Sequence, residues 1–519
     1  MTSEFDVIIV GYGPSGMVLA SALGQSGHRV AVVERWPQLY GLPRMSHIDD
    51  ETARIVQATS NVDEALRDAT PIATYRFVNV AGETLTSVCT GDTAVDICGY
   101  WADLSIYQPD IEDAIDARVA SHPSVERMLG WEATQLRSDD LGVTLQVRDT
   151  KRSEEVELRG RYLVGCDGAR SFTREAVGIK RTDLGFNERW VNIDMLVLRS
   201  LPERFSETIQ HCDPARGHMH MPIGTKGLRV EVALLPDEDV AEFTTPEFAW
   251  HWLSERLGLG PEDVEIIRQT VYTFEARCAE RWRDGRILLA GDACHTMPPY
   301  MGQGACSGMR DGMNLSWRLD LVLRGLASDS LLDSYETERK PHVTVITEMA
   351  IALGKIANEH DPEKARLRDE FIRSHALTKP ETPSLHGGML DPEGSALTGK
   401  IWPQGTVRVG ERSGRFDDVV GRGFVLLSRT SLDDVLSPET KSALDAIGCL
   451  RLSFADFEDT DGKYSSYFDS NAIDCLLARP DFVIFGTRGD STSAASLVNN
   501  LLNGLQYRSA IRAEQGVVA

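Results

Sequence analysis

The chain has 519 residues, which at about 100–200 residues per domain corresponds to about two to four domains. It holds 54 Lys and Arg against 78 Asp and Glu, a formal net charge of −24 at pH 7. This acidic balance argues against a nucleic-acid-binding surface, because phosphate binding relies on clustered cations. The hydrophobic content of 42% and the charged content of 25% are ordinary for a globular protein and argue against extensive disorder.

The sequence also lacks signs of export or membrane insertion. No apolar run approaches the ~20 residues that cross a bilayer. The short apolar run near the N-terminus follows acidic residues, unlike a signal peptide. The nine cysteines are scattered and form no CxxC pair, as is typical of reduced intracellular thiols. We therefore expect a soluble cytoplasmic protein without a membrane or nucleic-acid partner.

The N-terminal residues carry the strongest local signal. A β-branched run over 5–10 predicts a buried parallel strand, and the glycine-rich segment 11–16 follows at once. The pattern then predicts a helix over 17–25 and a second strand over 29–34, which ends in Glu34. This order is typical of a βαβ unit that binds a dinucleotide. The alternative is a βαβ unit without a ligand, and the pattern alone does not separate FAD from NAD.

Each glycine of this turn has its own task in such a unit. Gly11 permits the tight turn, Gly13 lets the pyrophosphate approach the backbone, and Gly16 lets helix and strand pack closely. The helix N-terminus then faces the phosphates, and Glu34 accepts hydrogen bonds from a ribose. We assign three neighbours to the same site: Pro14, Ser15 and Arg35.

Two distant segments point to the same kind of site. Residues 162–171 predict a strand that runs into a turn and the start of a helix. Residues 286–295 predict another strand, ending in Gly-Asp at Asp292, where a carboxylate could hold a ribose hydroxyl. The loop 302–304 could place backbone N–H groups against the edge of a flavin ring, where negative charge develops on reduction.

With these three motifs in order, the chain resembles the para-hydroxybenzoate hydroxylase family of single-component FAD-dependent aromatic hydroxylases. The motifs are GYGPSG at 11–16, CDGARSFTR at 166–174 and GDACHTMPPYMGQG at 291–304. Pro43-Arg44 and Tyr107-Gln108-Pro109-Asp110 are further matches. Within the family, the chain is most similar to the phenol-type hydroxylases that act on 3-(3-hydroxyphenyl)propionate. The resemblance is strong to about residue 345 and weaker beyond.

The resemblance implies roles for particular residues. Arg44 and Gln108 would contact the FAD phosphates and ribose, and Asp292 the ribityl chain or a nearby phosphate. The isoalloxazine ring would lie against the loop after Pro299, formed by Gly302, Gln303 and Gly304. A further motif, associated with both FAD and the nicotinamide nucleotide, contains Asp167, Gly168 and Arg174. No second glycine-rich βαβ unit is found, so NADH or NADPH would bind transiently near the flavin.

We expect an α/β fold: a Rossmann-like FAD-binding domain, an inserted β-sheet substrate domain, and a C-terminal domain that resembles a thioredoxin-like one. Apolar and polar residues alternate over 181–274, as in a half-buried sheet, and this supports the inserted domain. Residues 340–375 read as helix. Strands are expected at 423–427 and 481–485. The C-terminal domain would be structural or would form a homodimer. The expected boundaries are 1–75, 100–180 and 275–345 for the FAD domain, 76–99 and 181–274 for the substrate domain, 346–405 for a helical and connecting arm, and 406–519 for the C-terminal domain.

The implied reaction is hydroxylation of a phenol, ortho or para to its existing hydroxyl. NAD(P)H would reduce the flavin, and O2 would add to it as a C4a-hydroperoxide that delivers an electrophilic OH. A phenol of pKa near 10 needs a base or a positive field to activate its ring. His47 is the first candidate, and its alternative is a satisfied, partly buried histidine.

Three more side chains are candidates for the catalytic or substrate site. His218 and His220 lie two apart on an expected strand, share one face, and could line the substrate cavity. Arg229 could pair a substrate carboxylate, although a solvated surface arginine is the alternative. We expect no metal, because no third ligand stands at a suitable spacing from the two histidines.

Three other functions are compatible with the same fold. A flavin-dependent halogenase or epoxidase is one, since Trp250-His251-Trp252 partly resembles a halogenase motif. A flavin-dependent dehydrogenase or oxidase is the second. The third is a flavin-bearing assembly protein without redox chemistry, against which the intact glycines, Arg44, Asp167 and Asp292 argue.

Overall fold

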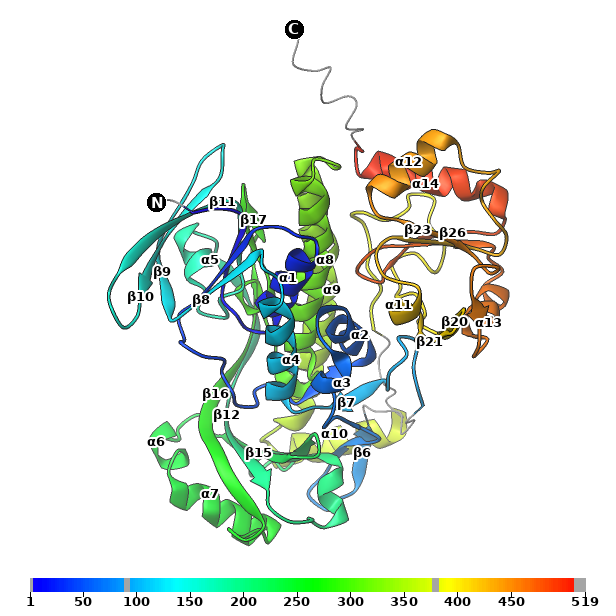
Figure 1. Ribbon diagram of the computed structural model, residues 1–519. Helices are drawn as coiled ribbons and strands as arrows, with labels where there is room; N and C mark the ends of the chain where they lie inside the picture. The colour runs from blue at the N-terminus through cyan, green and yellow to red at the C-terminus, as the bar shows by residue number, and fades with distance from the viewer. Residues whose placement is uncertain (1–2, 88–93, 376–381, 508–519) are drawn as a thin grey trace.

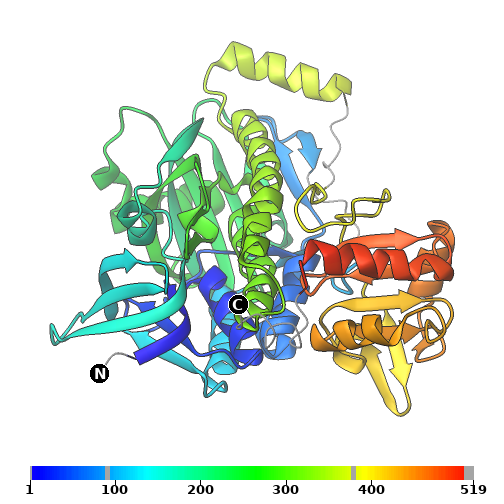
Figure 2. The same cartoon turned by 90° about the horizontal axis from the view of Figure 1, so that it is seen from above.

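The computed structural model describes residues 3–87, 94–375 and 382–507, and it confirms the expected α/β class (Figure 1). Two eight-stranded sheets are built from residues up to Thr296. The C-terminal residues form a smaller unit that lies to one side of these sheets in both views (Figures 1 and 2). Parts of the expected domains, including residues 88–93 with Cys89 and residues 376–381, lie outside the described residues.

The first sheet is of the Rossmann type, with β1 (Ser3–Val10) at its centre. It pairs in parallel with β2 and β11, and Val7, Ile8 and Ile9 have no exposed surface, as expected for a strand covered on both faces. The helix expected over 17–25 is α1 (Pro14–Gln25), which packs against α4 (Gln108–Ala120) and α8 (Gln303–Leu323). The other strands are β2 (Val30–Glu34), β8 (Val125–Leu129), β9 (Trp131–Ser138), β10 (Val143–Asp149), β11 (Glu155–Gly165), β17 (Arg283–Asp284) and β18 (Ile287–Leu289).

The second sheet forms the wall opposite the first and has the order β19-β16-β12-β15-β14-β13-β5-β6. Its apolar face, with Val230 and Val232, packs under α6 (Val240–Phe243) and α7 (Pro246–Trp252). The opposite face carries Arg229 and Glu231, because neighbouring residues of a strand alternate sides. The strands are β5 (Tyr75–Val78), β6 (Thr84–Ser87), β12 (Arg181–Val197), β13 (Thr208–His211), β14 (His218–Ile223), β15 (Gly227–Leu234), β16 (Val264–Ala279) and β19 (His295–Thr296).

The remaining elements of this part of the chain are short. Three strands form a third sheet in the order β3-β7-β4, and α2 contacts it at β3. These elements are β3 (His47–Asp49), β4 (Thr70–Pro71), β7 (Asp103–Ser105), α2 (Asp50–Thr59), α3 (Val62–Ala65) and α5 (Phe172–Ala176), with short turns η1 (Glu203–Ser206), η2 (Leu253–Leu257), η3 (Gly291–Ala293), η4 (Pro299–Met301) and η5 (Asp329–Leu332).

Residues 340–375 are mostly helical, as predicted, but the stretch is divided between two helices. They are α9 (Asp333–Ala357) and α10 (Pro362–His375), which diverge in Figure 2. The break has a local cause: Asp361 accepts a hydrogen bond from the backbone N–H of Glu363 at 2.9 Å, and Pro362 has no N–H to continue the preceding helix.

The C-terminal unit is thioredoxin-like, with the sheet order β23-β22-β25-β26 and helices on both faces (Figure 1). The expected strand over 423–427 is β22 (Val425–Ser428), whereas the strand expected over 481–485 begins only at Ile484. Phe482 has φ 65° and its N–H bonds back to the carbonyl of Arg479 at 3.0 Å, so a turn takes the first residues. The other elements are β20 (Thr406–Val409), β21 (Arg412–Arg415), α11 (Phe416–Val419), α12 (Pro438–Ala446), β23 (Leu450–Ser453), β24 (Glu458–Asp459), α13 (Lys463–Ser470), β25 (Cys475–Ala478), β26 (Ile484–Arg488), η6 (Ser491–Ser493) and α14 (Ala494–Gly504).

The structure bears on two features considered in the sequence analysis, the cysteines and membrane-spanning helices. Eight cysteines are buried and none of them is paired within this part of the chain. No helix in residues 3–87, 94–375 and 382–507 has the length and apolarity to cross a membrane.

Candidate active site

The glycine turn between β1 and α1 leaves open space where a dinucleotide phosphate would lie. Gly11 has φ +99°, and a Cβ there would meet the carbonyl oxygen of Cys166 at 2.3 Å. A Cβ on Gly16 would lie 2.2 Å from the carbonyl oxygen of Gly11, so Gly16 serves packing and does not line the cavity. A Cβ on Gly13 would meet nothing within 4 Å. The turn therefore fits a pyrophosphate at Gly13 and the helix N-terminus behind it.

Glu34, at the end of β2, holds the turn and borders the same cavity. Its two carboxylate oxygens accept the backbone N–H groups of Tyr12 at 2.9 Å and Trp36 at 3.0 Å. The Arg35 guanidinium lies 5.4 Å from the centre of the Trp36 ring. Glu34 and Arg35 both line the cavity, where a ribose would reach them.

The motif after β11 builds a turn as well as a cavity wall. Asp167 accepts hydrogen bonds from the Ser171 hydroxyl at 2.5 Å and the Thr173 N–H at 2.8 Å, and with Gly168 it lines the cavity. The assignment of Arg174 to the cofactor site requires correction. Its guanidinium donates to the carbonyls of Ala169 and Ala293, both at 3.1 Å, and it does not line the cavity.

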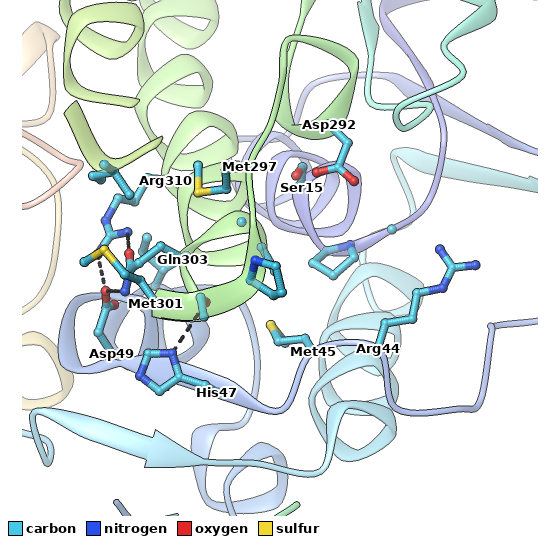
Figure 3. A pocket seen from close by; sticks show the side chains of 18 of the residues that line it. Ser15, Arg44, Met45, His47, Asp49, Asp292, Met297, Met301, Gln303 and Arg310 are labelled. Carbon is cyan, nitrogen blue, oxygen red and sulfur yellow. Dashed lines mark hydrogen bonds and ion pairs between the residues drawn. The ribbon is translucent and has the colours of Figure 1, made fainter. Parts of the chain in front are cut away.

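The motif after β18 supplies a carboxylate that is open to the cavity. Asp292 points into it beside Ser15 and has no hydrogen-bond or ion-pair partner among the described residues (Figure 3). Gly302, with φ +65°, then redirects the chain from η4 into α8. Pro299, Gly302, Gln303 and Gly304 all line the cavity. An unpartnered carboxylate next to a helix N-terminus suits a ribityl or ribose hydroxyl on one side and a flavin ring edge on the other.

The loop containing Arg44 is held by two residues that were expected to bind ligands directly. The Gln108 side-chain oxygen accepts the N–H groups of Arg44 at 2.7 Å and Met45 at 2.6 Å. Arg229 donates to the carbonyls of Pro43 and Arg44, both at 2.8 Å, and pairs with a buried aspartate. Both residues line the cavity, but their polar groups mainly shape the loop. Arg44 itself is exposed, lines the cavity and stacks on the ring of Tyr40; Figure 3 shows its side chain.

The start of α8 is fixed by a cluster that joins Gln303 to three residues not assigned to the site from the sequence. Arg310 pairs with Asp49 and Glu51, and it donates to the Gln303 side-chain oxygen at 2.9 Å. Gln303 in turn donates to Asp49 at 2.9 Å (Figure 3). Burial raises the pKa of Asp49, but the charge of Arg310 outweighs it and brings that pKa below its ordinary value. In the sequence, the run of three acidic residues at 49–51 was the feature that could have indicated this cluster.

His47 lies behind Gly302, where the chain turns from η4 into α8. We call residues 299–304 the flavin loop, because they are expected to face the flavin ring. Its Nε2 is 3.0 Å from an Asp103 carboxylate oxygen, and its Nδ1 is 3.4 Å from the Gly302 carbonyl oxygen. Burial lowers the pKa of His47, but hydrogen bonds with Asp103 and Cys306 outweigh it and raise the pKa to about 10. A histidine that keeps its proton at neutral pH can supply a positive field, but it cannot act as the general base that removes the proton of the phenol.

We predict that His47→Ala retains FAD and slows substrate hydroxylation by about tenfold, because it removes a cation behind the flavin loop. Stopped-flow and steady-state turnover, with flavin content measured by absorbance, test this. His47→Gln keeps a hydrogen-bonding side chain without the charge and should lose nearly as much. Unchanged turnover of both variants at every pH would remove His47 from the mechanism.

The expectation that His218 and His220 line the substrate cavity is wrong. Neither lines it, whereas Met219 and Met221 do. The period of two was correct, but it does not tell which face of β14 is turned inward. The His218 ring stacks on that of His211 at 4.3 Å and meets Trp252 of α7 edge-on at 5.5 Å, so the histidines belong to the outer layer.

The cavity continues from the glycine turn to the second sheet and has a volume of about 1750 Å³. Sites for single drug-sized ligands span about 300–1000 Å³, so the cavity has room for a dinucleotide and a second molecule. The open glycine, the free carboxylate and the helix N-terminus define a Rossmann-type dinucleotide-binding protein with an adjoining substrate chamber.

Comparison with known families identifies the dinucleotide. Residues 4–350 match the family model described as FAD binding domain, and residues 399–503 match that described as HcaD C-terminal domain. The chain belongs to the FAD binding domain family. The resemblance drawn from the three motifs is thereby confirmed, and FAD is the cofactor.

Curated relatives cover nearly the whole chain. A probable NADH-specific resorcinol 4-hydroxylase of Rhodococcus jostii (strain RHA1) is 35% identical over 96% of this chain and 94% of its own length. A 3-(3-hydroxy-phenyl)propionate/3-hydroxycinnamic acid hydroxylase of Mycobacterium sp. (strain JLS) is 31% identical over 93% of this chain and 89% of its own.

Solved structures show the same fold. The flavin-dependent monooxygenase PieE, in complex with FAD and substrate, matches with a TM-score of 0.82 at 22% identity, covering 97% of this chain and 99% of its own. Aklavinone-11 hydroxylase, with FAD and aklavinone, matches with a TM-score of 0.79 at 24% identity, covering 97% and 100%. At these identities the likeness concerns the fold.

Proposed function

We propose that this protein is an FAD-dependent monooxygenase that uses NADH and O2 to hydroxylate a phenolic ring. The observation that carries the proposal is the continuous cavity, which joins a dinucleotide site at Gly13 to a chamber under the second sheet. The family match, and relatives that hydroxylate resorcinol or hydroxyphenylpropionate, support the same reaction. FAD, when bound, supplies the redox chemistry: it accepts hydride and activates oxygen.

The chain's own residues hold the cofactor and shape its surroundings. The turn at Gly13 and the N-terminus of α1 would receive the pyrophosphate, and Glu34 would lie at the adenosine ribose. Asp292 would accept a hydrogen bond from the ribityl chain, and the N-terminus of α8 after Gly302 would face the flavin ring. Enclosing the reacting ring between two sheets excludes water from it.

Finer features of the site stay proposals. Arg44, which is exposed and lines the cavity, would meet the phosphates of FAD or of the incoming NADH. A homodimer through the C-terminal domain and a cytoplasmic location likewise remain predictions. The small-molecule phenol and O2 are the partners that the reaction requires.

The alternative of a halogenase has little support in the geometry. Trp252 belongs to α7, on the outer face of the second sheet, and neither it nor Trp250 lines the cavity. A dehydrogenase or oxidase would use the same cofactor site, but it would reduce the flavin with its substrate in place of NADH and would insert no oxygen into the product.

The decisive experiment measures NADH and NADPH oxidation by the FAD-loaded protein, with and without resorcinol, phenol and 3-(3-hydroxyphenyl)propionate. Hydroxylated product and peroxide are quantified in the same samples. We expect one of these phenols to stimulate NADH oxidation and to be hydroxylated in a nearly one-to-one ratio. Oxidised but unhydroxylated product would instead indicate a dehydrogenase, and the absence of stimulation by every phenol would overturn the proposal.

A further inference from the structure

The inner face of the second sheet presents two rows of side chains to the substrate chamber. Direct register pairs place Glu231 opposite Met219 on one side and Asn192 on the other. The next row joins Met221, Arg229 and Asp194. Opposed residues in an antiparallel sheet point to the same side. Of these residues, Met219, Met221, Arg229 and Glu231 line the cavity, so methionine side chains, which suit an aromatic ring, stand beside a single acid that borders it.

Glu231 keeps unused hydrogen-bonding capacity in its carboxylate. It is 4% exposed and lines the cavity. One carboxylate oxygen, Oε1, accepts the Asn192 amide at 2.8 Å and lies 3.8 Å from the Arg229 guanidinium. Its other oxygen, Oε2, receives no hydrogen bond from any described residue. The carboxylate is therefore oriented by Asn192, with one oxygen left for a ligand.

Arg229 and Arg268, the two arginines whose charges act on Glu231, are already committed to other partners. Arg229 donates to Asp194 at 2.7 Å and to two loop carbonyls. Arg268 pairs with the same aspartate and donates to the Tyr40 and Tyr272 hydroxyls at 3.0 and 2.7 Å. Neither guanidinium offers its charge freely to a substrate carboxylate, so the acceptor at Glu231 favours a ligand with an O–H group.

The chamber also places Glu231 near the flavin loop. Tyr300 of η4 lines the same cavity, and the charge of Glu231 acts on its phenol. The Tyr300 hydroxyl accepts the Asn358 amide at 2.6 Å, and its ring meets Trp190 edge-on at 6.2 Å. A ring held between Glu231 and η4 would lie between the sheet wall and the loop that faces the flavin.

We propose that Glu231 is a catalytic residue that binds the ring hydroxyl of the phenol and accepts its proton during hydroxylation. The inference rests on the proposed function and names its base. As the ring carbon bonds to the transferred oxygen, the O–O bond of the activated oxygen breaks; the phenol O–H bond also breaks, its electron pair enters the ring, and the proton forms a carboxyl O–H on Glu231. The attacked carbon then loses its own hydrogen as a proton, which restores the aromatic ring, and the second oxygen atom leaves as water. No oxidant beyond those of the proposed reaction is needed, and the proton returns to solvent afterwards.

The surroundings of Glu231 set the pH at which it can act. Burial raises the pKa of Glu231 to about 7, although the charge of Arg229 opposes the rise. The groups facing it are Arg229 on its own strand, Asp194 and Asn192 on β12, Arg268 on β16 and Tyr300 on η4, while β14 contributes the uncharged Met219. Because the ionised form accepts the proton, kcat/KM should rise as pH increases through about 7.

The test compares wild type with Glu231→Gln, which keeps the size of the side chain and removes the basic oxygen. We expect hydroxylation of resorcinol to fall about 100-fold with FAD content unchanged, and the rise through neutral pH to disappear. In a series of ring-substituted phenols, the loss should be largest for the least acidic and small for those already ionised in the assay. A merely structural role would give an equal loss across the series and would overturn the proposal.

The matched control is Glu188→Gln. Glu188 lies on β12, on the same face as Asn192, but it does not line the cavity, so this variant should retain wild-type rates. Binding of resorcinol to the oxidised FAD-loaded enzyme without NADH gives a second readout. Wild-type affinity should increase about tenfold above neutral pH, and the affinity of Glu231→Gln should not vary. If wild type binds this way but hydroxylates nothing, the proposed function fails while the Glu231 contact stands. If wild type hydroxylates resorcinol and Glu231→Gln matches it, Glu231 is excluded.

Discussion

Gly13→Val should give a folded protein that lacks FAD. Gly13 has φ −81° and ψ −177°, an extended conformation that valine adopts without strain. Its Cβ would meet no protein atom within 4 Å and would instead fill the space assigned to the pyrophosphate. We expect FAD affinity to fall about 100-fold or more, equivalent to about 2.8 kcal/mol, because the backbone N–H groups of the turn can no longer approach the phosphates.

Flavin absorbance of the purified protein, FAD titration followed by fluorescence, and circular dichroism measure this effect. Gly489→Val is the matched control, since its nearest non-neighbouring atom, the Ala472 carbonyl oxygen, lies 3.6 Å from the added Cβ and the site is remote from the cavity. The control should retain FAD. A yellow, FAD-loaded Gly13→Val protein would refute the placement of the cofactor.

Arg479→Met should lower the free energy of unfolding by about 3–5 kcal/mol, because it leaves buried carboxylates without their partner. Arg479 is fully buried and joins the C-terminal unit to α9. It donates to both oxygens of Glu338 at 2.9 Å and to those of Asp481 at 2.6 and 3.0 Å. Arg318 completes the cluster, 2.7 Å from Glu338. Denaturant unfolding of the FAD-loaded protein measures the loss.

The same cluster predicts how stability changes in acid. Burial raises the pKa of Glu338, but the charges of Arg318 and Arg479 outweigh it and lower the pKa to about 2, below the ordinary 4.5. Its stabilisation is therefore complete above about pH 4.5 and is lost as the pH falls toward 2. Arg479→Met should weaken this acid dependence.

Arg429→Met is the matched control for Arg479→Met. Arg429 belongs to the same C-terminal unit, but its ion pairs with Asp469 and Asp474 lie at the surface, where such pairs contribute about 0–1 kcal/mol. Equal destabilisation by the two substitutions would contradict the role given to the buried cluster.

Local patterns were sufficient for the cofactor half of the site. The turn at 11–16, the acid at Glu34 and the Gly-Asp pair at Asp292 lie at strand ends, and chain connectivity alone brings the ends of parallel strands to one edge of a sheet. For this reason the dinucleotide site, the α/β class and the family could be predicted from sequence motifs.

The substrate half depended on which face of a sheet is turned inward. The alternation in β14 is visible in the sequence, yet it is equally compatible with histidines or methionines facing the chamber. The packing of α7 on the other face decided in favour of Met219 and Met221. The same choice on β15 turned Glu231 into the chamber.

The sequence by itself determined the class of protein, its cofactor and the position of the flavin loop, because those signals reside in short segments with fixed backbone geometry. Only the tertiary structure decided that His47 is held as a cation by Asp103, that Arg229 holds a loop, and that Glu231 lines the substrate chamber. Each of these roles depends on partners brought together from distant parts of the chain, and a partner's charge and burial set the chemistry of a side chain more strongly than its own type does.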